Sequence, residues 1–138
     1  MKPDSFEFWF DFSCPYAYLA STQVQALAER ARVAVVLRPM LLGGVFRAVE
    51  QHQNLAATLS APKASHMRDD LRRYAALWGV SLRFPSNHPM RTVTALRALI
   101  ACGEGDWDLI HAIYRAYWVE GRDISDRDVI GAILNEQG

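Results

Sequence analysis

The sequence is poor in cysteine, has no excess of charge of either sign and contains no long hydrophobic run. Its two cysteines, Cys14 and Cys102, are too few for a disulfide framework or a cysteine-based zinc site. The four histidines show no metal-ligand spacing, so we expect no metal. Fifteen basic residues balance fifteen acidic ones, which disfavours a nucleic-acid-binding module.

The sequence also shows neither a membrane-spanning stretch nor a signal peptide. Arg38 interrupts the best apolar stretch, residues 33–46, which stays below the roughly 18 residues that a membrane helix needs. Asp4 and Glu7 lie where a signal peptide would carry apolar residues. We therefore expect a cytoplasmic protein with no membrane partner. A length of 138 residues with 51% hydrophobic and 22% charged side chains fits a globular domain with its own core.

Hydrophobic periodicity predicts a strand, a helix and a second strand in the first forty residues. In residues 6–12 phenylalanine occupies every second position, which is typical of a β-strand. Pro15 suits the first turn of a helix, and an apolar stripe continues from there to Ala31. The β-branched run 33–37 predicts the second strand. With a helix of this length between them, the strands are expected to be parallel neighbours.

After residue 40 the pattern is helical. Ser60 and Gly79 are expected to bound the longest helix, and Ser125 with Asp128 resembles a capping box. No convincing third strand follows, because residues 80–84 are few and end at a proline. Since a two-stranded sheet is marginal alone, we expect a partner chain or a longer protein to complete it. The predicted helices span residues 41–50, 62–78, 89–102, 106–119 and 125–135.

The turn between the first strand and the first helix is the candidate site, and it carries Ser13 and Cys14. Free backbone N–H groups and the positive end of the helix dipole meet at such a turn and favour anions and thiolates. A cysteine there can have a lowered pKa and act as a nucleophile, and a serine can donate a hydrogen bond to a bound thiolate. The structural alternative is a small buried Cys14 beside a helix-capping Ser13.

The two cysteines are not expected to form an intramolecular redox pair. Cys14-Pro15-Tyr16-Ala17 has the frame of a C-x-x-C motif, but alanine replaces the second cysteine. Cys102 lies in an apolar helix and is expected to be inert core. Disulfide cycling within this turn is therefore excluded.

Four stretches, in order, carry a family resemblance. Residues 11–20, DFSCPYAYLA, resemble the opening of the 2-hydroxychromene-2-carboxylate isomerases and kappa-class glutathione transferases, in the DsbA-like branch of the thioredoxin superfamily. Residues 37–44, residues 54–78, and residues 88–92 with the helix after them resemble later parts of the same family.

The resemblance implies an α/β fold that is thioredoxin-like (DsbA-like) and carries an inserted all-α helical domain. Residues 1–40 would form the N-terminal β-α-β half of the thioredoxin-like domain, and residues 41–138 the inserted helical domain. The C-terminal β-β-α half of the thioredoxin fold would be missing from this chain.

The same resemblance assigns candidate site residues. The family's catalytic serine, whose hydroxyl stabilises the glutathione thiolate, corresponds to Cys14, and Ser13 stands one place earlier. A thiol is a weaker donor than a hydroxyl. Cys14 as donor, Cys14 in a mixed disulfide with glutathione, and Ser13 as donor therefore stay open, and we favour Cys14 as the acting residue. Asn54 and Lys63 correspond to contacts of the substrate or of glutathione; from the residues alone they are a loop residue and a solvated charge.

The function implied is a glutathione-dependent isomerase with glutathione as its cofactor and an aromatic carboxylate as its small-molecule substrate. The thiolate would add to a conjugated carbon, the bond would rotate, and the thiolate would leave. The alternatives are a single-cysteine thiol–disulfide oxidoreductase, a glutathione transferase of the same family, and a non-catalytic truncated subunit. The family also implies a homodimer. The aromatic stripe of Tyr114, Tyr117 and Trp118 is expected to belong to the core.

Overall fold

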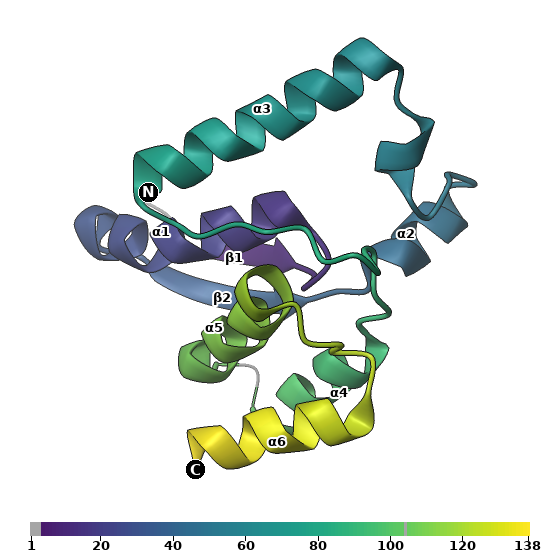
Figure 1. The fold of residues 1–138 in the computed structure, drawn as a ribbon. Coiled ribbons are helices and arrows are strands. Elements are labelled where there is room, and N and C mark those ends of the chain that lie inside the picture. Colours follow the sequence, from purple (N-terminus) through teal and green to yellow (C-terminus); the bar gives the residue numbers. More distant parts are fainter. Residues whose placement is uncertain (1–3, 104) are drawn as a thin grey trace.

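The chain begins with a parallel pair of strands joined by a helix (Figure 1). The structure is a computed structural model that describes residues 4–103 and 105–138. Strand β1 (Ser5–Phe10) pairs in parallel with β2 (Ala34–Pro39), with Phe8 opposite Leu37, and helix α1 (Pro15–Ala31) connects them. This confirms the predicted strand–helix–strand order and the parallel pairing.

The rest of the described chain is helical, as predicted, although several boundaries differ. The helix expected from residue 89 begins only at Val93, and the stretch expected as one helix over 106–119 changes from α- to π-helical geometry at Ala116. The elements are α2 (Leu42–Ala48), the 3-10 turn η1 (Leu55–Thr58), α3 (Ala61–Trp78), α4 (Val93–Cys102), α5 (Trp107–Arg115), the π turn η2 (Ala116–Glu120) and α6 (Arg127–Gln137).

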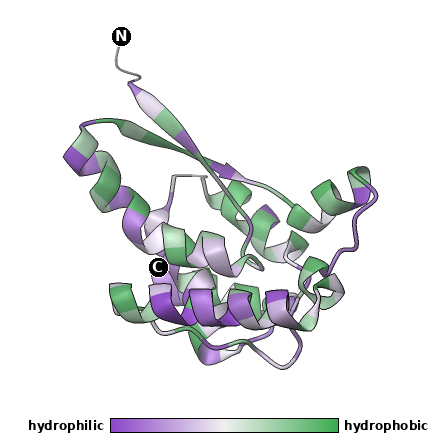
Figure 2. Ribbon diagram, turned by 90° about the horizontal axis from the view of Figure 1, so that it is seen from above, coloured by the Kyte–Doolittle hydropathy of each residue, from purple (hydrophilic) through white to green (hydrophobic). Residues whose placement is uncertain are grey.

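One face of the sheet is buried beneath an aromatic core. Phe8 stacks on Trp107 of α5 with ring centroids 6.3 Å apart, and Phe10 lies within 6.3 Å of Tyr114. The opposite face carries Glu7 and Trp9, and Trp9 is 56% exposed. Both strands lie at one edge of the molecule (Figure 2). Within β1 the alternation therefore separates a core face from an open face. It ends with the strand at Phe10, short of the predicted residue 12, and Asp11, which the alternation would place on the open face, is buried.

Helix α3 packs on α1 and presents a largely hydrophilic surface in its middle turns (Figure 2). Gly79 ends it with φ 64°, a left-handed conformation that glycine adopts without strain, as the sequence predicted. The cap of the last helix differs from the prediction, because Asp126 accepts a hydrogen bond from the Asp128 N–H at 2.8 Å and Ser125 is not the cap. No described helix is long and apolar enough to cross a membrane.

The buried core is continuous across residue 40. It joins Phe10 and Leu37 to Leu71 of α3 and Tyr114 of α5, so the division into residues 1–40 and 41–138 stays a prediction. The expectation that Cys102 is inert core is wrong: this residue ends α4 and is exposed. The apolar face of α4 consists instead of Ala95, Leu96 and Leu99.

Candidate functional site

Two aromatic side chains from distant sequence hold the turn between β1 and α1. The Trp118 indole N–H donates to the Phe12 carbonyl at 2.9 Å, and the Tyr114 hydroxyl donates to the Asp11 carbonyl at 3.3 Å. Both side chains are almost fully buried, so these bonds are shielded from water. The prediction that the aromatic stripe belongs to the core is confirmed, and the stripe also fixes the backbone that carries Ser13 and Cys14.

Asp11 ties this turn to the next element. Its side chain is 2% exposed, and its carboxylate accepts hydrogen bonds from the Leu42 N–H at 2.7 Å and from the Ser13 N–H at 3.4 Å. Burial raises the pKa of Asp11, while the Thr92 side chain and the Leu42 N–H act in the opposite direction. One buried carboxyl group thus joins the end of β1 to the start of α2.

Cys14 is the N-cap residue of α1, and its thiol is half-buried beside Asp11. Burial raises the pKa of Cys14, the N–H groups of Ala17 and Tyr16 lower it, and the charge of Asp11 raises it further. The net direction of the pKa shift is upward, opposite to the lowering that a helix N-terminus can produce, and it agrees with the alternative of a buried Cys14. The physical reason is that the loss of water around the sulfur outweighs the helix-terminal N–H groups. Cys14 therefore carries its proton at neutral pH.

A cavity of about 710 Å³ opens in front of this turn. Its wall is formed by the start of α1, by α2 and η1, by the first half of α3 and by residues 84–93. Ser13, Cys14 and Asn54 all line it, so the structure brings together three of the four predicted site residues. The Asn54 side chain also caps η1 by accepting from the Ala57 N–H at 3.3 Å. Lys63 is exposed on α3 and is not part of the wall.

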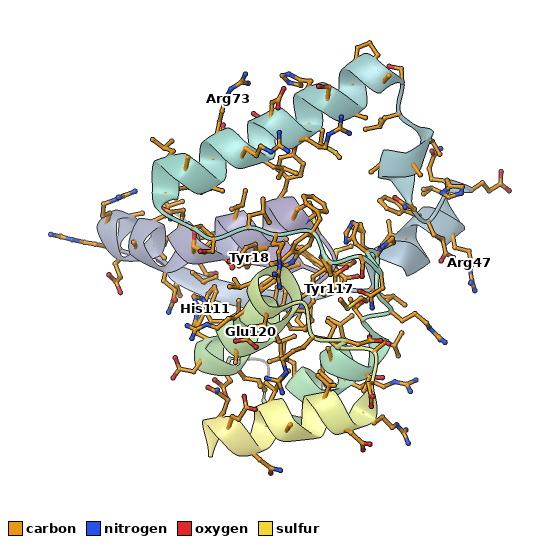
Figure 3. The ribbon with its side chains drawn as sticks, in the orientation of Figure 1. Tyr18, Arg47, Arg73, His111, Tyr117 and Glu120 are labelled. Carbon is orange, nitrogen blue, oxygen red and sulfur yellow. The ribbon has the colours of Figure 1, made fainter. Side chains whose placement is uncertain are left out.

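Three arginines bring positive charge to the cavity wall. Arg47, Arg68 and Arg91 line the cavity, and Asp11 is the acidic residue on its wall. In the part of the chain that the structure describes, none of these three arginines forms an ion pair. Arg47 projects from α2 (Figure 3). No sequence pattern links these arginines, because they come from three separate segments that only the fold brings to one wall.

His88 also lines the cavity, although the sequence alone does not mark it as a site residue. Its ring packs edge-on to Phe84 at 5.2 Å, and its Nδ1 lies 2.7 Å from the Tyr117 hydroxyl. The His88–Pro89 peptide bond is cis. In the sequence, His88 and Pro89 stand together in the stretch 88–92 that carries family resemblance, and this is the one signal that points to the histidine. Within the described residues, no group of three or more potential ligands could hold a metal ion.

Comparison with known proteins identifies the family. The model of the DSBA-like thioredoxin domain matches residues 6–138. The chain belongs to this family. Its fold is accordingly the DsbA-like thioredoxin fold, rich in helix with a small sheet, as the resemblance implied.

The relatives include enzymes of two named kinds. The chain is 25% identical to a 2-hydroxychromene-2-carboxylate isomerase of Pseudomonas putida, over 95% of this chain and 64% of the relative. It is 28% identical to an enzyme of the same name from Sphingobium xenophagum, over 96% of this chain and 67% of the relative. It is also 28% identical to glutathione S-transferase kappa 1 of Caenorhabditis elegans, over 82% of this chain and 51% of the relative.

Solved structures show the same fold. A 2-hydroxychromene-2-carboxylate isomerase superposes with a TM-score of 0.73 at 23% identity, covering 95% of this chain and 71% of that one. The cytosolic disulfide reductase DsbM from Pseudomonas aeruginosa, solved with GSH, gives 0.61 at 23% identity, over 97% of this chain and 65% of that one. The chain spans about two thirds of the length of the isomerases that it matches.

Proposed function

We propose that this chain contributes a glutathione-dependent isomerase site that acts on an aromatic carboxylate. The observation that carries the proposal is the cavity in front of α1, which places Cys14 and Ser13 on one wall with three arginines that have no ion-pair partner in the described structure. The names of the sequence relatives, isomerases and a kappa-class transferase, support the reaction class.

The residues present fit glutathione. A volume of about 710 Å³ lies within the usual range of small-molecule sites. Arg47, Arg68 and Arg91 offer cations for carboxylates, and the start of α1 offers N–H groups and a dipole that favour an anionic sulfur. Bound glutathione would supply a thiolate that adds to a conjugated carbon of the substrate and leaves again after the bond has rotated.

The chain's own residues would hold the two partners and stabilise charge. Because Cys14 carries its proton at neutral pH, its S–H can donate a hydrogen bond to an anionic sulfur, and the Ser13 hydroxyl is a second donor on the same turn. The apolar part of the wall, with Leu41, Phe46 and Met67, suits an aromatic body. The arginines would hold the carboxylate and stabilise negative charge as it develops on the substrate. Asn54 is a candidate contact at the η1 side.

A thiol–disulfide oxidoreductase is the alternative with an observation in its favour, since the cavity wall includes Cys14 and leaves the exposed Cys102 out. Such an enzyme would use Cys14 alone, through mixed disulfides. The raised pKa of Cys14 disfavours it, because the thiolate is the form that attacks a disulfide.

Substitutions of Cys14 separate the two functions. Isomerisation of a cis/trans-isomerisable aromatic carboxylate would be followed by NMR with and without glutathione, beside reduction of glutathione disulfide. We expect Cys14→Ser to keep or raise the isomerisation rate, because a hydroxyl is the better donor. Cys14→Ala should lie roughly tenfold or more below Cys14→Ser, as expected for losing a hydrogen bond to a charged group.

Cys102→Ser is the matched control, because it removes an exposed thiol outside the cavity wall. If Cys14→Ser abolishes all turnover while Cys102→Ser does not, the oxidoreductase alternative replaces the isomerase. If a folded wild-type chain shows neither activity and does not bind glutathione, the proposed function is refuted and the non-catalytic subunit remains.

A further inference from the structure

A buried phenol fixes the proton of a histidine on the cavity wall. The Tyr117 side chain is fully buried in η2, near the centre of the molecule (Figure 3). Its oxygen accepts a hydrogen bond from the Met90 N–H at 3.1 Å and lies 2.7 Å from His88 Nδ1. These two contacts are the ones that the phenol oxygen makes within the described residues.

The direction of the second bond follows from the first. A backbone N–H can only donate, so the phenol oxygen accepts from Met90 and has its own proton left for His88. Nδ1 of His88 is then the acceptor. A neutral imidazole whose Nδ1 accepts carries its proton on Nε2. The opposite arrangement, in which His88 donates to the phenol, would leave the buried phenol proton without a partner.

Nε2 of His88 is the polar atom left for a ligand. Within the described residues, the structure shows no hydrogen bond to this nitrogen. The buried side-chain nitrogen without a partner is His111 Nε2, so the unpartnered His88 Nε2 is not sealed from solvent. The ring lines the cavity beside Phe84, and Arg91 lies three residues further on the same wall. Burial lowers the pKa of His88, which supports the neutral ring at physiological pH.

We infer that His88 Nε2–H donates a hydrogen bond to the carboxylate of an aromatic acid bound in the cavity, and that Tyr117 is the positioning residue that sets this tautomer. Phe84 would contact the aromatic body, and Arg91 would contribute charge to the same carboxylate. The inference rests on the proposed function only in taking this cavity as the substrate site. It requires neither glutathione nor turnover.

The tautomer is tested without any ligand. In the full chain labelled with ¹⁵N-histidine, long-range ¹H–¹⁵N correlation spectra distinguish a protonated ring nitrogen from an unprotonated one, and His88→Gln assigns the signal. We expect a protonated Nε2 and an unprotonated Nδ1 in the wild type. Tyr117→Phe removes the phenol proton and should give a mixture of both tautomers. A protonated Nδ1 in the wild-type chain would overturn the inference.

Ligand binding is tested with cinnamate as the probe, in the absence of glutathione. We expect His88→Leu to weaken binding roughly three- to tenfold, the effect of one lost hydrogen bond, and His88→Gln, which keeps a donor, to restore part of the affinity. His66→Leu is the matched control, because His66 is an exposed histidine of α3 outside the cavity wall.

Three results would refute the inference: unchanged affinity in His88→Leu, an equal loss in His66→Leu, or no binding of cinnamate by the wild-type chain. Failure here is distinguishable from failure of the proposed function. Isomerisation that depends on glutathione and Cys14 can persist even where the His88 variants bind cinnamate like the wild type.

Discussion

At the scale of single residues, Asp11 shows how one buried carboxyl group shapes the site. Its carboxylate accepts hydrogen bonds from an N–H group of its own turn and from one at the start of α2. Its charge also lies close enough to Cys14 to raise the pKa of the thiol. The same group therefore positions the cavity wall and adds to the effect of burial, which is the main cause of the raised pKa of the thiol. Its burial has a measurable consequence for stability.

Burial holds the pKa of Asp11 above its usual value of 3.8, so the folded state binds this proton more tightly than the unfolded state. Stability contributed by this group therefore increases as the pH falls from neutral through the folded pKa, and the gain is complete below the unfolded pKa. Asp11→Asn cannot titrate. We expect the difference in unfolding free energy, wild type minus Asp11→Asn, to grow as the pH is lowered toward 4, as measured by urea denaturation.

Asp4→Asn is the control for removing a carboxylate, because Asp4 is exposed. A difference between wild type and Asp11→Asn that shrinks on acidification would contradict the prediction. It would mean that the hydrogen bonds to the ionised carboxylate outweigh the cost of its burial.

At the scale of elements, the π turn η2 that follows α5 connects two distant parts of the backbone through one residue, Trp118. The Trp118 carbonyl accepts a hydrogen bond from the Arg83 N–H at 2.8 Å, which fixes the extended segment after α3. The Trp118 indole reaches the other way, to the Phe12 carbonyl. π turns are frequent at functional sites, and here one turn joins both sides of the cavity wall.

Trp118→Phe tests this connection. The substitution keeps an aromatic ring and removes the indole N–H, which leaves the buried Phe12 carbonyl without its donor. We expect the free energy of unfolding to fall by about 1–3 kcal/mol in urea denaturation. Trp9→Phe, at a side chain that is 56% exposed, should stay within about 0.5 kcal/mol. Equal effects of the two substitutions would show that the indole bond does not stabilise the turn.

At the scale of the whole molecule, zero net charge conceals an uneven distribution. Fifteen basic and fifteen acidic residues cancel in the chain, yet the cavity wall carries Arg47, Arg68 and Arg91 against the buried Asp11. The balanced composition disfavours an extended phosphate-binding surface, but it cannot detect a local site for an anion of small size. An anionic ligand therefore remains compatible with a neutral protein.

Two arginines of α3 form a matched pair for this prediction. Arg68 lines the cavity, while Arg73 projects from the outer side of the helix (Figure 3). We expect Arg68→Gln to weaken glutathione binding roughly two- to fivefold in low salt, as measured by calorimetry, since an exposed charge contributes modestly. The effect should diminish with added salt. Arg73→Gln should leave the affinity for glutathione unchanged. An equal loss in both variants would show that the overall positive charge of α3 attracts glutathione and that Arg68 makes no specific contact.

Much of the fold was predictable because its signals are local. The period of two in residues 6–12, the proline at the start of α1 and the glycine at the end of α3 each depend on neighbouring residues. The structure contains each predicted element, although the first strand ends at Phe10 instead of residue 12. The boundaries that were wrong depend on distant contacts. Residues 89–92 stay outside α4 where the Met90 N–H binds Tyr117, and the long helix changes to a π turn where Trp118 contacts two distant backbones.

By itself, the sequence determined the order of elements, the parallel strand pair and the turn that carries Ser13 and Cys14, since alternation, proline placement and motif spacing act over a few residues. Tertiary structure decided the chemistry of that turn. Burial, with a smaller contribution from a neighbouring carboxyl group, raises the pKa of Cys14 against the lowering that helix-terminal N–H groups favour, because solvation depends on what packs around the sulfur. The fold likewise brings three arginines and His88 to the cavity wall and leaves Lys63 outside it, because a cavity is assembled from segments far apart in the chain.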